Sequence, residues 1–198
     1  ERVSALFAAH AAELINWNRK MNLTAITRPR DMAIKHFLDA LAPAELIPDG
    51  SRLLDIGSGG GFPGVPLKIV KPSLVVFLID GVRKKVNFLK HVIRTLHLEN
   101  VTALHIRAEH LLQDPAYTKS FDVIISRAVS ALGSFVKSAL PLLTEQGVIV
   151  AMKGEIDQKD LAALHAITAA DRYVFEIENY SLPSQRTQRS IVMIRLSN

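Results

Sequence analysis

The sequence predicts an α/β protein with a doubly wound, mostly parallel sheet between two layers of helices, a three-layer sandwich. From Ser51 onward, short apolar runs alternate with helical stretches, as expected for strands that are buried on both faces. Five of the ten glycines lie within residues 57–64, directly after the first apolar run. Two late β-rich stretches are joined by a loop that is too short for a parallel crossover.

Residues 1–50 are expected to form a helical extension in front of the main unit, which spans residues 51–198 as one compact domain. Apolar side chains lie near helical spacing in the first segment, and a second amphipathic segment follows Pro29. Trp17 lies at helical spacing from Leu14, so we expect it to pack in the core between the extension and the sheet.

The main unit is expected to alternate strands and helices and to end in a hairpin. Runs that are apolar on both faces predict parallel strands at residues 52–56, 73–79, 101–106, 121–125 and 147–152. Helical patterns fill the intervals, at residues 63–70, 82–98, around 109, 131–143 and 157–170. The stretches 172–182 and 189–196 then predict a hairpin, with one strand antiparallel at the sheet edge.

The composition excludes several kinds of site. The chain has no cysteine, which excludes disulfides, thiolate metal sites and cysteine nucleophiles. The histidines lack metal-ligand spacing, so we expect no metal. No apolar run reaches the roughly 18 residues of a membrane span, and we expect a cytoplasmic protein without a membrane partner. The net charge of +5 favours an anionic partner.

The glycine-rich segment fits two ligand-binding patterns. From Gly59, the residues GGGFPG satisfy the dinucleotide pattern G-x-G-x-x-G, and Asp80 follows at the spacing of a ribose-binding carboxylate. From Asp55, the stretch is D-x-G-x-G-x-G, with Gly57, Gly59 and Gly61 in step. In both patterns, bare backbone lets a ligand approach the main chain where a Cβ would block it.

The end of the preceding strand favours the second pattern. The strand is expected to stop at Ile56, so the dinucleotide pattern begins two residues too late. Phe62 and Pro63 also place bulk where a pyrophosphate needs open amides. We therefore favour S-adenosylmethionine, a cofactor without a diphosphate, with Asp80 on its ribose. An NAD-dependent oxidoreductase and a purely structural loop remain alternatives.

Several segments together resemble one family. They are LLDIGSGGGFPGVPLKI at 53–69, WNRKMNLTAI at 17–26, HFLDAL at 36–41, SRAV at 126–129 and AMKG at 151–154. Over most of its length, the chain resembles the RsmG (GidB) family. The resemblance implies a class I, Rossmann-like methyltransferase that methylates N7 of guanine 527, in the 530 loop of 16S rRNA. It implies 16S rRNA or the small ribosomal subunit as partner, and we expect the enzyme to be a monomer.

The resemblance also assigns roles to single residues. On the cofactor side, it implies contacts from Gly57, Phe62, Ala108 and Glu109, beside the ribose-binding Asp80. Arg127, in SRAV, is implied to lie between cofactor and target base, both as a cofactor contact and as the candidate catalytic residue. The implied RNA-facing residues are Asn22, His36, Lys153 and Arg189.

Further basic residues are expected near the carboxyl ends of the strands, where they would contact phosphates. They are Arg28, Arg30, Lys35 and Arg186, together with the lysine and arginine already named. The basic run at 83–85 is instead expected to form the solvated side of a helix. The sequence departs from the family at Ser190, where many members have a basic residue, and at Gly81, where serine is frequent.

The residue types fit guanine N7 as acceptor. Methylation of cytosine C5 needs a cysteine nucleophile, which the chain lacks. Guanine N7 carries a lone pair and no proton, so alignment is the main requirement. Because the product is cationic, we expect Arg127 to stack on the base or to bond O6 or phosphate. A methyltransferase of another RNA or of a small molecule, and a basic RNA-binding module with a vestigial cofactor loop, remain alternatives.

Overall fold

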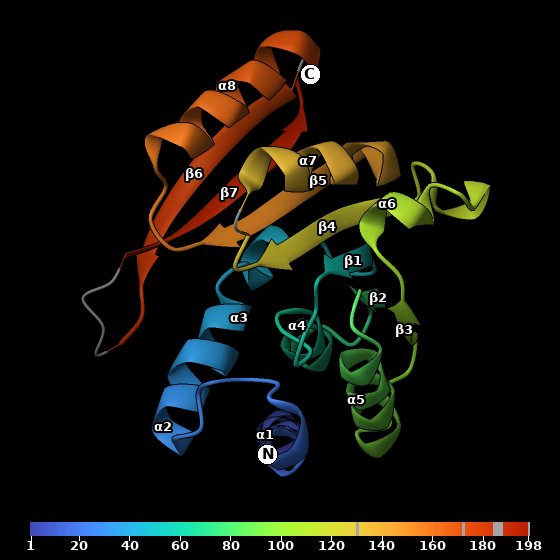
Figure 1. Cartoon of the computed structure of the whole chain (residues 1–198), viewed down its shortest axis with the longest axis vertical. Coiled ribbons are helices and arrows are strands. Elements are labelled where there is room, and N and C mark those ends of the chain that lie inside the picture. Colours follow the sequence, from blue (N-terminus) through green and yellow to red (C-terminus); the bar gives the residue numbers. More distant parts are fainter. Residues whose placement is uncertain (130, 172, 184–187, 198) are drawn as a thin grey trace.

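A seven-stranded sheet forms the centre of the computed structural model, which describes residues 1–129, 131–171, 173–183 and 188–197 (Figure 1). Arg186, one of the expected basic residues, lies outside these ranges. The strand order is β3-β2-β1-β4-β5-β7-β6. The strands are β1 (Arg52–Ile56), β2 (Val75–Asp80), β3 (Val101–His105), β4 (Phe121–Arg127), β5 (Leu143–Lys153), β6 (Tyr173–Ser181) and β7 (Gln188–Leu196). The predicted α/β architecture is confirmed.

The order of the strands reverses beside β1, which pairs in parallel with both β2 and β4. The chain builds outward from β1 through β2 to β3 and then returns to place β4 on the other side of β1. At such a switch point, the loops after the two central strands turn away from each other and leave a crevice at their carboxyl ends. The sheet therefore provides a binding position directly after Ile56 and Arg127.

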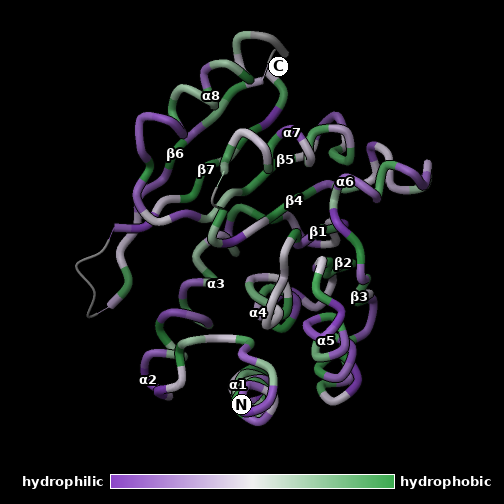
Figure 2. Tube along the Cα trace, viewed as in Figure 1, coloured by the Kyte–Doolittle hydropathy of each residue, from purple (hydrophilic) through white to green (hydrophobic). Residues whose placement is uncertain are grey.

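The terminal hairpin forms as expected, but its antiparallel strand is not the edge strand. β7 lies between β5 and β6 and is antiparallel to both, so β6 forms the edge. The two strands take these places because the residues of β7 can be buried on both faces and those of β6 cannot. The central residues 190–194 of β7 are all buried, whereas burial along β6 alternates. A strand that is apolar on both faces has to be covered on both. Residues 191–194 of β7 are divided between the hydrophobic clusters on the two faces, and Figure 2 shows this strand coloured as hydrophobic.

Strand β5 begins earlier than the sequence predicts, at Leu143 instead of Gly147. Its pairing with β4 is irregular between Phe121 and Val123, where the register shifts. The polar residues 144–146 occupy this bulge, and a bulge interrupts the alternation by which a strand is predicted from sequence.

Helices cover both faces of the sheet. The extension, α4 and α5 pack on one face around residues such as Leu14, Val65 and Phe88. Helices α6, α7 and α8 pack on the other around Leu111 and Val136 (Figure 1). The longer helices are α1 (Arg2–Met21), α4 (Gly64–Val70), α5 (Arg83–Thr95), α7 (Leu132–Ala139) and α8 (Gln158–Asp171). The short ones are α2 (Pro29–Met32), η1 (Ala33–Leu38), α3 (Asp39–Leu41), η2 (Ala44–Leu46), α6 (Ala108–Leu111), η3 (Pro115–Tyr117) and η4 (Leu140–Leu142).

The extension shares one hydrophobic cluster with the main unit. Leu14 and Phe37 are buried in the same cluster as Leu53 of β1. Trp17 packs edge-on against Phe88 of α5, with ring centroids 5.6 Å apart. It is half-buried at the edge of the core, between the extension and a helix and not against the sheet as expected. None of the helices in the described part of the chain combines the length and apolar character needed to cross a membrane.

Gly64, the first residue of α4, sits where no side chain fits. A Cβ there would overlap Leu78 of β2 and lie 2.8 Å from Oδ2 of Asp55. We expect Gly64→Ala to lower the free energy of unfolding by about 1–3 kcal/mol, the usual cost of overpacking a core. The measurement is urea unfolding followed by circular dichroism.

Gly154→Ala is the matched control, because a Cβ at Gly154 meets no atom within 4 Å among the described residues. Its free energy of unfolding should stay within about 0.5 kcal/mol of that of the parent. Equal effects of the two substitutions would contradict the steric account of Gly64.

Candidate active site

The turn after β1 consists of glycines in the left-handed region of backbone space. Gly57, Gly59 and Gly61 have φ angles of 74°, 55° and 89°. The N–H groups of Gly57 and Ser58 both donate to the carbonyl of Ile79, at 2.8 and 3.0 Å, which fastens the turn to β2. Residues with a Cβ rarely adopt such angles, so the glycines are needed for the turn itself.

Asp55 holds this turn from behind. Its side chain is fully buried at the end of β1, and its Oδ2 accepts a hydrogen bond of 3.0 Å from the N–H of Gly64, at the start of α4. Burial raises the pKa of the Asp55 carboxyl from 3.8 to about 7. The protein's own carboxylate thus occupies the helix N-terminus that a dinucleotide pyrophosphate would need.

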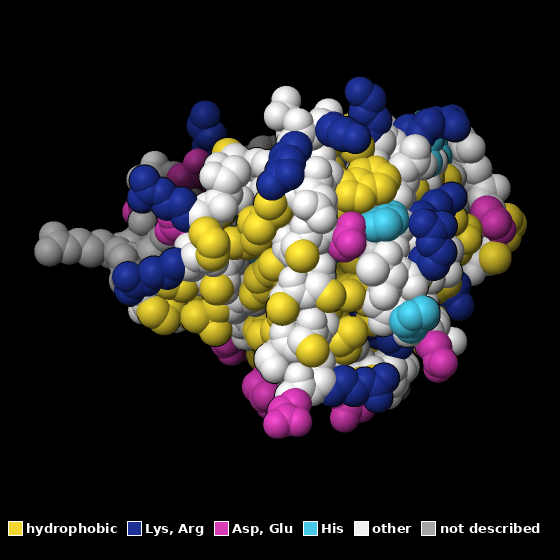
Figure 3. Space-filling view, turned by 90° about the horizontal axis from the view of Figure 1, so that it is seen from below, with side chains coloured by type: hydrophobic (Ala, Val, Ile, Leu, Met, Phe, Trp, Pro, Cys, Tyr) yellow, Lys and Arg dark blue, Asp and Glu magenta, His cyan; other side chains and the backbone are white. Residues whose placement is uncertain are grey.

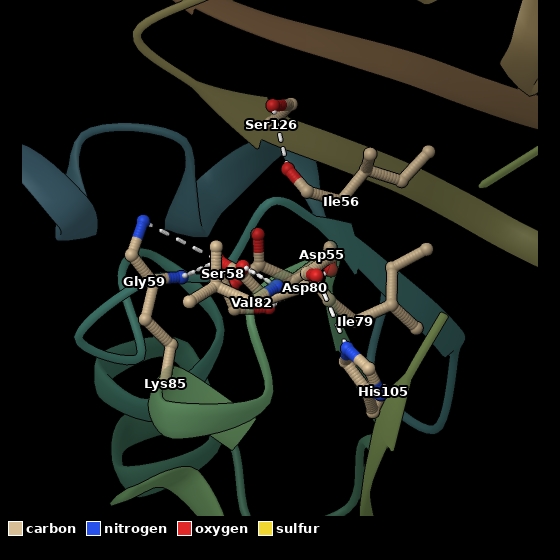
Figure 4. Close-up of polar contacts among 11 residues, drawn as sticks. Asp55, Ile56, Ser58, Gly59, Ile79, Asp80, Val82, Lys85, His105 and Ser126 are labelled. Atoms are coloured by element: carbon tan, nitrogen blue, oxygen red, sulfur yellow. Dashed lines mark hydrogen bonds and ion pairs between the residues drawn. The ribbon is translucent and has the colours of Figure 1, made fainter. Parts of the chain in front are cut away.

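Asp80 fixes the loops that follow both β1 and β2 (Figure 4). Its Oδ2 accepts from the N–H of Gly59 at 3.1 Å, and its Oδ1 accepts from the N–H of Val82 at 2.8 Å. Lys85 Nζ lies 3.8 Å from Oδ2. The carboxylate therefore has a defined orientation at the end of β2, where the sequence places the ribose-binding acid.

One cavity of about 460 Å³ opens at the carboxyl ends of β1, β2 and β4. It brings together several residues that lie far apart in sequence and were all expected at the site: Gly57, Asp80, Ala108, Glu109 and Arg127. Others that line it were not expected, among them Gly81, Ile106, Ser126, Ala128 and Phe135. Ser126 also ties β4 to β1, because its hydroxyl donates to the carbonyl of Ile56 at 2.7 Å (Figure 4).

Asp55, Gly59, Gly61 and Phe62 do not line this cavity, although the sequence places all four among the cofactor residues. A Cβ at Gly61 would lie 2.8 Å from Cγ2 of Val65, so this glycine allows the start of α4 to pack. Phe62 is 4% exposed, since its ring points into the core. In the structure, these residues shape the turn and do not face the cavity.

Phe62 is the centre of an aromatic stack that joins the glycine turn to the extension. Its ring stacks on His10 of α1 and on His36 of η1, with centroids 4.9 and 4.6 Å away. The Arg127 guanidinium carbon lies 5.0 Å from the Phe62 centroid, a cation–π contact. The ring thus supports Arg127.

Arg127, the last residue of β4, is held by the extension. Its NH1 donates to the carbonyl of Lys35 at 2.9 Å and to Oδ2 of Asp39 at 3.3 Å. Its NH2 lies 3.2 Å from Nδ1 of His36. These contacts reach back about 90 residues along the chain and fix the guanidinium at the cavity wall.

His36 is placed to accept a hydrogen bond from Arg127. Burial, and next the positive charge of Arg127, lower the pKa of His36 from 6.5 to about 4, so the ring is neutral at pH 7. With Nδ1 accepting from Arg127, Nε2 carries the proton and donates to Thr24 Oγ1, 2.7 Å away. His36 lies in the π-helical turn η1, a local geometry that is frequent at functional sites.

The other RNA-facing candidates lie in different environments. Asn22 is exposed and ends α1 with a φ of 50°. Arg189 lies 4.0 Å from Asp39, close to Arg127. Lys153 has a side chain that is only 10% exposed; it donates to the carbonyl of Val129 at 2.9 Å and pairs with Asp160 at 3.1 Å. Lys153 therefore holds the loop after β4 against α8.

Of the further basic residues, Lys35 forms a half-buried pair with Asp31, and Arg28 is exposed. Arg83 and Lys84 are exposed at the start of α5, as expected for a solvated helix side, whereas Lys85 of the same run is half-buried and turns toward Asp80. Figure 3 shows Lys and Arg side chains around the margin of one face of the molecule, with hydrophobic side chains in its middle. In the described part of the chain, no cluster of three or more His, Asp or Glu is arranged to hold a metal ion.

Asp39 is a buried polar residue near the site that the sequence did not single out. It is 1% exposed, and besides Arg127 it contacts Tyr180 of β6 and Arg189 of β7. It lies inside the HFLDAL segment, but its partners are 88 to 150 residues away, and no local spacing indicates them. The signal that the sequence does contain is an acidic residue within an apolar helical stretch, where an acid is costly unless it is paired.

Comparison with known proteins identifies the family. The family model for rRNA small subunit methyltransferase G (GidB) matches residues 4–192. The chain belongs to this family. The ribosomal RNA small subunit methyltransferase G of a Geobacter species is 46% identical over 93% of this chain and 84% of its own length. That of Oceanobacillus iheyensis is 37% identical over 98% of this chain and 83% of its own length.

A solved structure shows the same fold in a more distant protein. A SAM-dependent methyltransferase from Aquifex aeolicus matches the GidB-family chain with a TM-score of 0.63 at 17% identity, over 85% of this chain and 94% of its own. The class I, Rossmann-like fold is thereby confirmed. Family membership confirms an enzyme, a methyltransferase, and S-adenosylmethionine as its methyl donor. This excludes the two alternatives of an NAD-dependent oxidoreductase and of an RNA-binding module with a vestigial cofactor loop.

The raised pKa of Asp55 predicts a pH-dependent stability. The folded chain binds this proton more tightly than the unfolded chain, whose pKa is 3.8, so the contribution is present below about pH 4 and lost as the pH rises to about 7. Asp55→Asn keeps an acceptor for Gly64 and does not titrate. Relative to the parent, we expect this variant to gain at least about 1 kcal/mol of stability between pH 4 and pH 7.

Urea unfolding of both proteins across this pH range measures the difference, in which the other titrating groups cancel. Asp49→Asn is the control, since Asp49 is exposed on the surface and pairs only with Lys71 among the described residues. A difference between parent and Asp55→Asn that does not change with pH would contradict the raised pKa.

Proposed function

We propose that this protein transfers the methyl group of S-adenosylmethionine to N7 of a guanine in 16S rRNA, guanine 527 in the 530 loop. The family's name supports small-subunit rRNA as the substrate class. The observation that carries the proposal is the position of Arg127. This side chain lines the same cavity as Asp80 and is fixed from behind by the extension. One end of the cavity thus suits the cofactor, and the other suits a base.

The cavity fits the cofactor in shape and chemistry. A Cβ at Gly57 would meet no atom within 4 Å, so the main chain is open to a ligand there. Each oxygen of Asp80 accepts one loop amide and retains a lone pair for a ribose hydroxyl. Ala108 and Glu109, at the start of α6, are proposed to lie against the adenine. The volume is within the usual range of small-molecule sites.

The chemistry needs alignment more than proton transfer. When bound, the cofactor supplies its sulfonium methyl group to the N7 lone pair, so that a C–N bond replaces the C–S bond and the positive charge passes to the guanine. Guanine N7 has no proton, so no side chain of the cavity has to remove one. Arg127 is proposed to hold the base by stacking or by a hydrogen bond to O6 or phosphate.

The proposal also covers the RNA contacts, the oligomeric state and the cellular location. A guanine in a loop can be unstacked and inserted into the cavity, while basic side chains contact the phosphates around it. Arg28, Arg30 and Arg189 are proposed for these contacts, and His36, through Arg127, for positioning the base. Asn22 is proposed as an RNA contact from the end of α1. The enzyme is proposed to act as a monomer in the cytoplasm.

The experiment that tests the proposal is transfer of labelled methyl groups to unmethylated small subunits and, separately, to naked 16S rRNA. Nuclease digestion and mapping then locate the modified nucleotide. A single 7-methylguanosine at guanine 527 is the expected product. Label at another nucleotide, or label only in small molecules, would replace the proposed substrate. If neither substrate is labelled although the protein binds the cofactor, the proposed rRNA substrate is rejected.

Arg127→Ala tests the residue at the base end of the cavity. We expect its methylation rate to fall by about tenfold or more, since the base loses its support, while the dissociation constant of S-adenosylhomocysteine changes by less than about threefold. The rate is measured under single-turnover conditions, and the affinity by calorimetry. Arg83→Ala, which removes an exposed arginine on α5, serves as control and should retain the parent rate. A near-parental rate for Arg127→Ala would refute its role.

A further inference from the structure

Asp39 is the common partner of three side chains that lie 88 to 150 residues further along the chain. Its Oδ2 accepts from NH1 of Arg127 at 3.3 Å. Its Oδ1 accepts from the hydroxyl of Tyr180 at 2.8 Å and lies 4.0 Å from Nε of Arg189. The acid belongs to the extension, whereas its partners belong to β4 and to the hairpin of β6 and β7. These contacts join the wall of the cavity to both flanking parts of the chain.

Because Asp39 is buried, its negative charge acts strongly on Arg127. Its side chain is 2% exposed and that of Arg127 is 17% exposed, so water screens their interaction little. Burial and the negative charge of Asp39 both raise the pKa of the Tyr180 hydroxyl, which therefore remains a donor at neutral pH. His36, the other side chain bonded to Arg127, is neutral. Among the described residues in contact with Arg127, Asp39 is thus the carboxylate that offsets its charge.

Guanine N7 methylation sets an electrostatic condition on this arrangement. The reaction starts with the positive charge on the cofactor sulfur and ends with it on the guanine ring. A base supported by Arg127 acquires its charge next to an arginine, and two positive charges repel each other strongly in a partly buried site. The guanidinium is still useful for binding, because its planar shape and its donors recognise the base. A nearby carboxylate reduces this repulsion, although Asp39 is shared between Arg127 and Arg189.

We infer that Asp39 is a positioning residue for methyl transfer that holds Arg127 against the cavity wall and offsets its charge as the guanine becomes cationic. This inference rests on the proposed function, and specifically on N7 as the acceptor. Asp39 acts through Arg127 and does not itself line the cavity. Tyr180 and Arg189 orient the carboxylate from the opposite side.

Asp39→Asn removes the charge and keeps the size of the side chain. We expect its single-turnover methylation rate on small subunits to fall by about tenfold or more, since the electrostatic support of the transition state is lost. The dissociation constant of S-adenosylhomocysteine should change by less than about threefold, because Asp80 and the glycine turn are untouched. Asp49→Asn, the exposed carboxylate used above, is the control and should retain the parental rate.

A double-mutant cycle separates this role from a general structural one. In an Arg127→Gln background the charge of Arg127 is gone and, of the described residues, only Arg189 still pairs with the acid, so adding Asp39→Asn should change the single-turnover rate by less than about twofold. A purely structural role of Asp39 would lower the rate by a similar factor in both backgrounds and would overturn the inference. Calorimetric titration with S-adenosylhomocysteine gives the folded fraction of every variant.

Tyr180→Phe provides a second route if Asp39→Asn does not fold. It leaves the carboxylate in place and removes one of its hydrogen bonds, and we expect a rate about two- to fivefold below that of the parent. An unchanged rate would overturn the inference.

The activity of the parent protein separates a failure of the proposed function from a failure of this inference. If the parent does not methylate guanine, the proposed function is wrong. If the parent is active and the Asp39→Asn variant is equally active, only the role of Asp39 is rejected.

Discussion

Buried aspartate side chains that accept hydrogen bonds from main-chain amides fix the loops on which the site depends. Asp55 holds the start of α4, and Asp80 holds the turns after β1 and β2. Without these bonds, the glycines that allow a ligand to approach would also leave the turn free to adopt many conformations. The parallel sheet determines where the strands end, and the carboxylates determine the path of the chain beyond those ends.

Besides fixed loops, the site needs an oriented Arg127, and the extension provides this orientation from outside the sheet. Arg127 belongs to β4, but the atoms that orient it belong to Lys35, His36 and Asp39, and Phe62 supports it from the glycine turn. The aromatic stack of Phe62 with two histidines joins the same elements through apolar contact. The two ends of the cavity are therefore coupled through one packed region, so a change in the extension reaches the base end of the site.

The sequence predicted those parts of the site that depend on local order along the chain. Gly57 follows β1, and Asp80 and Arg127 end β2 and β4, and parallel strands bring such positions to one edge. Orientation was less predictable: Phe62 turns into the core, and Lys153 binds the loop after β4. Asp39 could not be predicted, because its partners lie far away in sequence. Similarly, the place of β7 inside the sheet depends on which strand has both faces covered, and the hairpin pattern alone does not show this.

The contact between Trp17 and Phe88 has a practical consequence. Trp17 is the single tryptophan of the chain, and it lies where α1 meets α5, against Phe88 and His91. Its emission therefore comes from one known interface between the extension and the main unit. The protein thus contains a natural optical probe of whether its two parts are docked, and detachment of the extension can be followed in real time without any label.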